Sequence, residues 1–114
     1  MANVKSLMTV TGIVIFNQNI YILEGYIYYN MKPIQTKYGA VVKNKHGYYR
    51  VITRKEGNYN KLLHKCVVED YYGKIPANHS IHHINMNKED NRIENLIILP
   101  MEQHMQLHQI LRGE

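Results

Sequence analysis

The chain has 114 residues, enough for one small domain with a short appendage. Hydrophobic residues make up 45% and charged residues 20%, which excludes a disordered chain, and no apolar run approaches the roughly 18 residues of a membrane-spanning helix. The single cysteine excludes an internal disulfide and a cysteine-rich zinc site, and the excess of 14 basic over 9 acidic residues favours a polyanionic partner.

The N-terminal half is rich in β-branched and aromatic residues and predicts a series of short antiparallel strands. We expect strands in the apolar runs Leu7–Phe16, Ile20–Tyr29, Tyr38–Val42 and Gly47–Thr53. Polar clusters separate these runs, and turns are predicted at residues 17–19 and 44–47.

The C-terminal half begins with a change to helical spacing. Apolar residues between Lys61 and Tyr72 recur at helical intervals, and Gly73 follows as the predicted C-cap. Beyond it we expect an extended segment at His79–Asn85, a polar turn at Asn87–Asn91, a strand at Leu96–Leu99 and a helix from Met101 to about Leu111. The predicted core residues here are Leu96, Ile98, Leu107 and Leu111.

The predicted fold class is therefore α+β, with two regions. Residues 1–60 form a basic, tyrosine-rich β region, and residues 61–114 form a linking helix followed by strand, loop, strand and helix.

Most of the positive charge lies in the first region, where tyrosines are interleaved with lysine and arginine. Basic side chains pair with phosphates and tyrosine rings stack on bases, so this pattern predicts a nucleic-acid surface. A solvated sheet face with packed tyrosine rings explains it equally well. The candidate contacts are Lys43, Lys45, Arg50, Arg54, Lys55, Lys61, Lys65 and Arg92, of which Arg92 also has Asp90 and Glu94 nearby as ion-pair partners.

The most informative feature is the spacing of histidines, four of which fall between residues 82 and 108. His104 and His108 are four residues apart on the predicted helix, so both rings project from one face, a common way to place two imidazoles on one metal ion. His82 and His83 are neighbours on an extended segment and point to opposite sides. One of that pair can join the helix histidines on a metal, which leaves the other beside it for proton chemistry.

These features together resemble the HNH nuclease family, most closely its small phage and intron-associated endonucleases. The resemblance runs from about Leu62 to His108 and is carried by these segments: Leu63-His64-Lys65, Gly73-Lys74-Ile75-Pro76, His82-His83-Ile84, Asn91-Arg92-Ile93-Glu94-Asn95-Leu96 and the final pair of histidines. It implies that the C-terminal half forms a ββα-metal motif, a two-stranded ribbon packed on a helix.

The resemblance also implies an activity and a set of site residues. The protein would be a metal-dependent DNA endonuclease that hydrolyses phosphodiester bonds and leaves 5′-phosphate and 3′-hydroxyl ends. His83 matches the general base, and Asn95 matches the asparagine that ties the loop together and so orients the base. His82, His104 and His108 match metal ligands.

The implied cofactor is one divalent ion, either Mg²⁺, Mn²⁺, Zn²⁺ or Ni²⁺. Three histidine ligands favour zinc or nickel, whereas two ligands, with His108 turned away, would favour the harder ions.

One departure concerns the turn after the paired histidines. Many HNH relatives carry Asp-Gly after His-His-Ile, where this chain has Asn85-Met86. The missing glycine removes an easy position of positive φ, and we expect Asn87 to adopt that conformation instead. His64, on the linking helix, fits a structural role and a phosphate-facing role equally.

The expected partner is DNA, in double-stranded form, with no membrane partner and with a homodimer left open. One active site per chain indicates nicking unless the protein dimerises. The resemblance and the single cysteine favour the cytoplasm of a bacterial host, with the protein encoded by a phage or mobile element. A structural zinc module and a DNA-binding protein without catalysis are the two alternatives.

Overall fold

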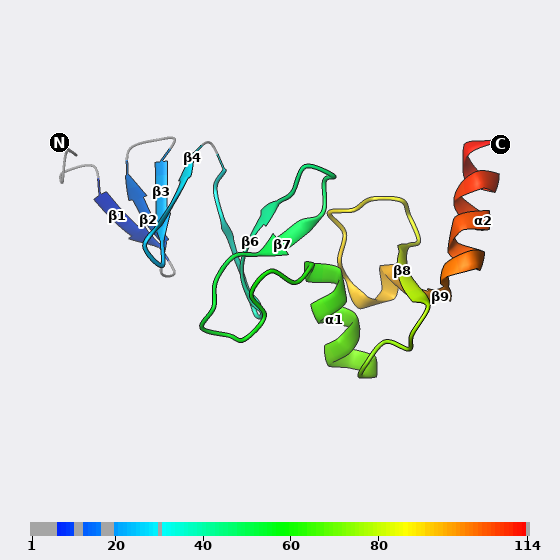
Figure 1. Ribbon diagram of the computed structural model, residues 1–114. Helices are drawn as coiled ribbons and strands as arrows, with labels where there is room; N and C mark the ends of the chain where they lie inside the picture. The colour runs from blue at the N-terminus through cyan, green and yellow to red at the C-terminus, as the bar shows by residue number, and fades with distance from the viewer. Residues whose placement is uncertain (1–6, 11–12, 17–19, 30, 114) are drawn as a thin grey trace. The chain divides into compact units, whose positions relative to one another are not determined.

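The computed structural model describes residues 7–10, 13–16, 20–29 and 31–113 (Figure 1). The chain divides into two compact units, residues 1–61 and 62–114. Over the described residues, their elements are antiparallel strands in three sheets, two α-helices and one short 3-10 helix, which confirms the predicted α+β class. Among the described residues, neither helix has the length and apolarity needed to cross a bilayer.

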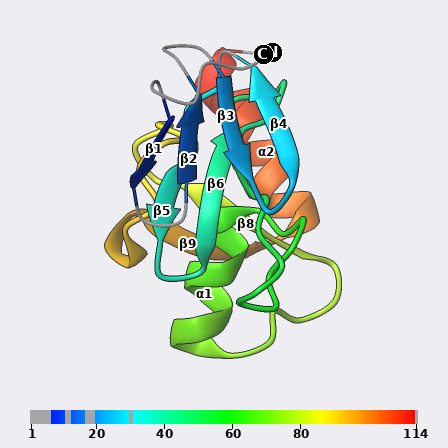
Figure 2. The ribbon, with the colours of Figure 1, turned by 90° about the vertical axis from the view of Figure 1, so that its left-hand side faces the viewer.

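The first sheet holds four antiparallel strands in sequence order, β1 (Leu7–Val10), β2 (Ile13–Phe16), β3 (Ile20–Leu23) and β4 (Tyr26–Tyr29) (Figure 2). The prediction of one strand in each of the first two apolar runs was wrong, because each run contains two paired strands. The second run reverses at Glu24 and Gly25, whose φ angles of 51° and 79° suit a tight hairpin turn. The predicted turn at residues 17–19 lies outside the described residues.

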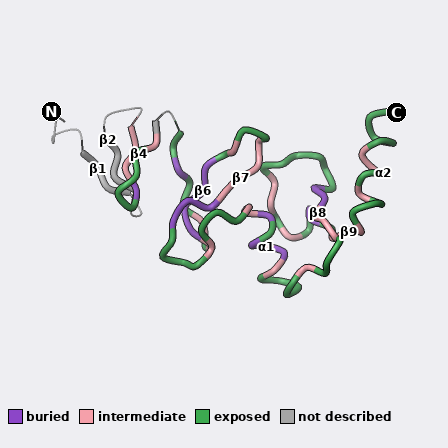
Figure 3. The backbone as a smooth tube through the Cα atoms, in the orientation of Figure 1, coloured by how far each residue is buried: buried purple, intermediate pink, exposed green. Residues whose placement is uncertain are grey.

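The second sheet of this unit has the order β5 (Ile34–Thr36), β6 (Gly39–Lys43) and β7 (Tyr49–Val51). β6 and β7 confirm two predicted strands, whereas β5 was not predicted. The turn at residues 44–47 is confirmed, since the Asn44 side-chain oxygen accepts hydrogen bonds from the backbone of His46 and Tyr48 at 2.9 and 3.0 Å. Val41, Val51 and Ile52 are fully buried in this region. Figure 3 draws the buried backbone near β6 in purple.

The second unit begins with α1 (Leu63–Tyr72), which buries Cys66 and Val68. The helix ends as predicted at Gly73, whose φ of 89° reverses the chain and whose N–H donates to the Glu69 carbonyl at 2.9 Å.

A two-stranded ribbon and a second helix complete this unit. The elements are β8 (His79–His83), the 3-10 helix η2 (Ile93–Asn95), β9 (Leu96–Pro100) and α2 (Met101–Arg112). β8 and β9 are antiparallel, with His82 opposite Ile97 and His83 opposite Leu96. α2 packs on both strands, and α1 contacts η2. The bounds of β8, β9 and α2 agree with the sequence prediction to within two residues, whereas η2 was not predicted.

The core prediction for this unit was right for Leu96, which is 4% exposed, but wrong for Leu111, which is 53% exposed. Ile98 and Leu107 are half-buried, and α2 has no fully buried residue. The physical reason is the size of the ribbon, because two strands can cover only a narrow stripe of a helix that spans 12 residues.

Candidate metal centre

The alternation of side chains along β8 divides its residues between two faces of the ribbon. Ser80 and His82 lie on the face that carries α2, as their contacts with His104 show. His83 points the other way and packs against His64 of α1, with ring centroids 5.0 Å apart. The predicted divergence of the two neighbouring histidines is therefore present.

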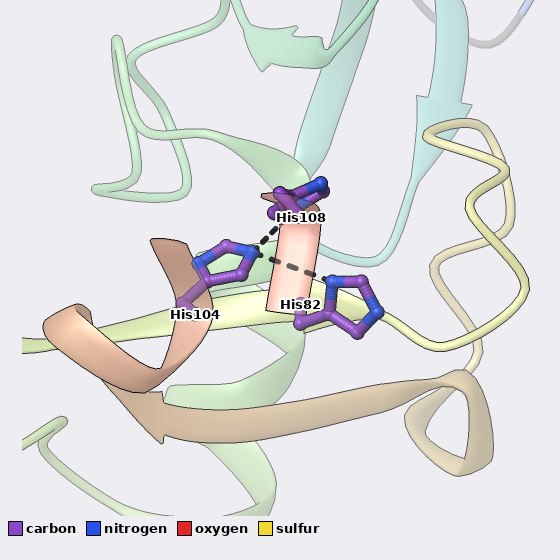
Figure 4. Close-up of side chains that lie close together, drawn as sticks. All are labelled: His82, His104 and His108. Atoms are coloured by element: carbon purple, nitrogen blue, oxygen red, sulfur yellow. Dashed lines mark hydrogen bonds between the residues drawn. The ribbon is translucent and has the colours of Figure 1, made fainter. Parts of the chain in front are cut away.

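Three imidazole rings converge between β8 and α2 (Figure 4). Nδ1 of His82 lies 3.3 Å from Nε2 of His104, and Nε2 of His108 lies 2.8 Å from the same atom. All three candidate ligand nitrogens lie within 4.8 Å of one another. The structure thus brings together every residue that the sequence suggested as a metal ligand, His108 included.

This donor set fits a divalent transition ion. Imidazole nitrogens bind zinc at about 2.0–2.1 Å, so nitrogens of one tetrahedral site are roughly 3.4 Å apart, close to the spacing of this cluster. A ligand must also be neutral. Burial, followed by the nearby His108, lowers the pKa of both His82 and His104 below the ordinary value of histidine, which favours the neutral form.

Ser80 fixes the orientation of His104, a contact that the sequence interpretation missed. Its hydroxyl lies 2.5 Å from Nδ1 of His104, so the opposite ring nitrogen, Nε2, is the one turned toward His82 and His108. The signal was present in the sequence, because residues 80 and 82 are two apart on a strand and share a face.

His83 has a different kind of partner, the side chain of Asn91. Nε2 of His83 lies 2.7 Å from the Asn91 side-chain oxygen. An amide oxygen only accepts hydrogen bonds, so Nε2 carries the proton and Nδ1 carries the lone pair. Asn91 therefore selects the tautomer of His83, and nothing in the spacing of the sequence singled it out.

His64 is buried beside His83, in an edge-to-face arrangement with an angle of 72° between the rings. Burial, and to a smaller extent the neighbouring His83, lowers the pKa of His64 to about 4. His64 is thus neutral at neutral pH and presents a ring rather than a charge to its neighbour. Of the two roles considered for it, this burial favours the structural one.

The segment that carries these residues matches a known family. A family model described as HNH endonuclease matches residues 61–106. We call residues 61–106 the HNH segment, because they are similar to HNH endonucleases. No curated protein and no solved structure matches the chain.

The match covers α1, β8, η2, β9 and the start of α2, and so includes His82, His83, Asn95 and His104 of the HNH segment. It ends two residues before His108, whose membership of the cluster rests on geometry alone. The resemblance inferred from the sequence is confirmed at the level of the family.

Asn95 holds together the loop of the HNH segment that joins the two strands. Its side chain accepts from the Asn85 backbone N–H at 3.0 Å and donates to the Asn85 side-chain oxygen at 3.0 Å and to the Asp90 carbonyl at 2.8 Å. Asp90 precedes Asn91 in the chain, so Asn95 fixes the path of the loop that brings Asn91 to His83. It acts on His83 through the loop rather than by side-chain contact.

The turn of this loop corrects one expectation. Met86, in the place where many HNH relatives have glycine, keeps the left-handed conformation with φ of 65°. The expectation that Asn87 takes that conformation was wrong. Asn87 instead accepts a hydrogen bond from the Glu89 backbone at 3.0 Å, which holds it in an Asx-type turn of ordinary φ.

His83 is only 5% exposed, and His82 4%. The exposure of His83 is small for a general base, which must reach a water molecule. Low exposure also holds the ring in one orientation, because the side chain is surrounded by protein on most sides.

The predicted nucleic-acid contacts of the first unit are mostly exposed. Arg50 is half-buried and donates to the Asn60 side chain at 3.1 Å. Arg54 stacks between Tyr26 and Tyr59, with its guanidinium carbon 4.7 and 3.9 Å from the ring centroids. The exposed members of the predicted set in this unit are Lys43, Lys45, Arg54, Lys55 and Lys61.

The two predicted contacts within the HNH segment differ from each other. Lys65 is exposed on α1. Arg92 is exposed too, but it pairs with Asp90 at 2.8 Å and lies 3.6 Å from Glu94. The Arg92 hydrogen bond also holds the pKa of Asp90 well below its usual range. The guanidinium group of Arg92 is therefore paired with carboxylates of the loop that joins the two strands.

Proposed function

We propose that this protein is a metal-dependent DNA endonuclease that hydrolyses phosphodiester bonds. The observation that carries the proposal is that the two neighbouring histidines of β8 have different partners on its two faces. His82 joins His104 and His108 on one face, while the adjacent His83 is held by Asn91 on the other. A cation site and a proton acceptor thus stand one residue apart, the arrangement that a ββα-metal nuclease requires.

His82, His104 and His108 would hold one divalent ion. When bound, such an ion stabilises negative charge on a scissile phosphate and on the leaving 3′-oxygen. Three imidazole nitrogens favour zinc or nickel over magnesium or manganese, because imidazole is a borderline ligand that hard ions bind weakly. Ser80 keeps Nε2 of His104 facing the other two rings.

His83 would act as the general base. With Nε2 donating to Asn91, Nδ1 accepts a proton from the attacking water. Imidazole is the side chain that most often acts as a general base in enzymes. Asn95 positions this base indirectly by holding Asp90, the residue before Asn91. Hydrolysis by this route would leave a 5′-phosphate and a 3′-hydroxyl.

The first unit would bind the DNA backbone, with double-stranded DNA as the preferred form. Phosphate contacts by exposed lysine and arginine side chains position a protein on DNA without reading its sequence. Lys43, Lys45, Lys55 and Lys61 are the exposed cations best suited to this role. One active site per chain would nick one strand, and a homodimer would cut both. A protein of this kind would work in the cytoplasm of a bacterial host, carried by a phage or mobile element.

The decisive experiment is incubation of the purified protein with supercoiled plasmid and Mg²⁺, Mn²⁺, Zn²⁺ or Ni²⁺ in turn. We expect nicking that a chelator abolishes and that DNA ligase can reseal, because ligase requires the predicted end groups. His83→Ala should remove the activity, whereas His46→Ala, in an exposed turn, should not. Plasmid left intact with every ion, or cut equally by His83→Ala, would refute the proposal.

The low exposure of His83 favours one second candidate, a DNA-binding protein of the same scaffold whose histidine cluster holds a structural zinc ion. It predicts no cleavage under any condition. Chelation would then lower the temperature of unfolding and weaken DNA binding, since a structural metal contributes directly to folding.

A further inference from the structure

A groove of about 440 Å³ lies within the second unit, and of its lining residues the proposed mechanism uses Ser80 alone. Its walls come from α1, from the loop of residues 74–78 and from β8. Its volume falls within the range of about 300–1,000 Å³ that is usual for small-molecule sites.

The lining of this α1–β8 groove combines three kinds of group. Leu62, Ile75 and Ile81 supply an apolar floor. Lys65 and Lys74 are exposed, and neither ammonium group has an ion-pair partner in the described part of the chain. Glu69 adds a carboxylate to the same wall.

These groups correspond to the parts of a nucleotide. A flat base stacks well on apolar surface, and a phosphate pairs with ammonium groups. A carboxylate accepts hydrogen bonds from the N–H groups on the edge of a base. A purely apolar ligand would leave the two lysines unused, and a purely anionic one would leave the apolar floor exposed.

The groove also borders both halves of the candidate metal centre. His64 lines it and packs against the ring of His83. Ser80 lines it and contacts Nδ1 of His104. A bound molecule is therefore one side chain away from the proposed base and from one proposed metal ligand.

We propose that the α1–β8 groove binds one nucleotide unit, with its phosphate at Lys65 and Lys74 and its base on the apolar floor. This role of the groove rests on the proposed nuclease function, because a nucleotide bound there would belong to the DNA substrate or would regulate its cleavage. The unit is either a nucleotide of the substrate strand next to the cleaved bond or a free nucleotide that acts on the same site.

The first experiment measures binding directly and needs no cleavage. The full chain is titrated with thymidine 5′-monophosphate, and backbone amide shifts are followed by NMR. We expect saturable shifts at residues 74–81. Lys65→Gln combined with Lys74→Gln should weaken the binding about tenfold, as two lost phosphate contacts predict. Ala77→Leu, which fills the groove without changing its charge, should weaken it similarly.

Lys88, exposed on the loop between the strands, supplies matched controls for charge and for bulk. Lys88→Gln and Lys88→Leu should bind thymidine 5′-monophosphate as the unchanged protein does. The absence of saturable shifts at residues 74–81 would overturn the proposal. So would shifts that the groove variants leave unaltered.

The second experiment identifies the source of the nucleotide. A KM for plasmid cleavage that rises in Ala77→Leu, with kcat retained, assigns the groove to the substrate strand. An unchanged KM, with thymidine 5′-monophosphate bound, assigns it to free nucleotides. If the unchanged protein cuts no DNA, the nuclease proposal fails by itself, while the titration still decides whether the groove binds a nucleotide.

Discussion

The two faces of β8 put the same side chain to different use. On the α2 face, His82 meets the nitrogens of two other imidazoles. On the α1 face, His83 contacts the side-chain oxygen of Asn91 and packs edge-to-face with the buried ring of His64. Both histidines are buried to the same degree, at 4% and 5% exposure, so burial does not separate them.

The difference shows that the partner of the second ring nitrogen decides what a histidine can do. His104 has its Nδ1 engaged by Ser80 and directs Nε2 into the cluster. His83 has its Nε2 engaged by Asn91 and keeps its lone pair on Nδ1. The amide oxygen of Asn91 restricts His83 to the tautomer that can accept a proton at Nδ1, whereas Ser80 orients the ring of His104 so that Nε2 faces the other two histidines.

The largest effect should come from removing the shared histidine of the α2 face. His104→Ala deletes the nitrogen that lies next to both other candidate ligands, so the dissociation constant for zinc should rise by about 100-fold or more. His83→Ala should leave this constant within about threefold. Isothermal titration against a competing chelator measures both. Equal losses in the two variants would mean that the faces are not separate in function.

The next effect concerns the α1 face alone. Asn91→Ala removes the acceptor that fixes the tautomer of His83, and kcat for plasmid nicking should fall by about 10- to 100-fold while KM and zinc affinity stay unchanged. Asn91→Asp restores an acceptor oxygen and should recover most of the rate. A variant pair that loses activity equally, or loses zinc binding, would assign Asn91 to the folding of the loop.

A third prediction uses His64, which contributes pH-dependent stability to the α1 face. Its pKa is lowered to about 4 in the folded state, against about 6.5 when unfolded, so the unfolded chain binds more protons between these values. The stabilisation is complete above about pH 6.5 and is lost as the pH falls toward 4.

The measurement is the free energy of unfolding by urea, with a chelator present so that no metal ion contributes. Between about pH 7.5 and about pH 4.5, the unchanged protein should lose about 2 kcal/mol more than His64→Gln does. Parallel pH profiles for the two proteins would show that the ring is not held neutral by its surroundings.

The sequence predicted the second unit better than the first because its signals are local. Gly73 ends α1 and Pro100 precedes α2, and each acts within its own turn of chain. In the first unit, strand ends depend on pairing partners. The apolar run at Ile20–Tyr29 is interrupted only by Glu24-Gly25, and these two residues are the sole sign in the sequence of the hairpin between β3 and β4.

The same distinction applies within the candidate site. The meeting of His104 and His108 follows from helical spacing, and the divergence of His82 and His83 follows from strand alternation. The contact between Asn91 and His83 follows from neither rule. It depends on the path of a loop that Asn95 holds through Asn85 and Asp90, and a path of that kind is a tertiary property.

The smallest predicted effect lies in that loop, which joins the strand of the two histidines to its partner. Met86 occupies the left-handed region, where a side chain costs roughly 1–2 kcal/mol, and glycine relieves this cost but loses about 0.5–1 kcal/mol through its greater freedom when unfolded. Met86→Gly should therefore stabilise the protein by about 0.5–1 kcal/mol, measured as a higher urea midpoint.

Asn87→Gly is the matched control on the neighbouring residue. It has no positive φ to relieve and loses the hydrogen bond from Glu89, so it should lower the same midpoint. A higher urea midpoint for Asn87→Gly, with no rise for Met86→Gly, would place the left-handed residue of the loop at position 87 instead of 86. The stabilised loop should leave zinc affinity and nicking unchanged. Met86 lies in the turn beyond β8, and its side chain is 47% exposed rather than packed against the candidate metal centre or His83.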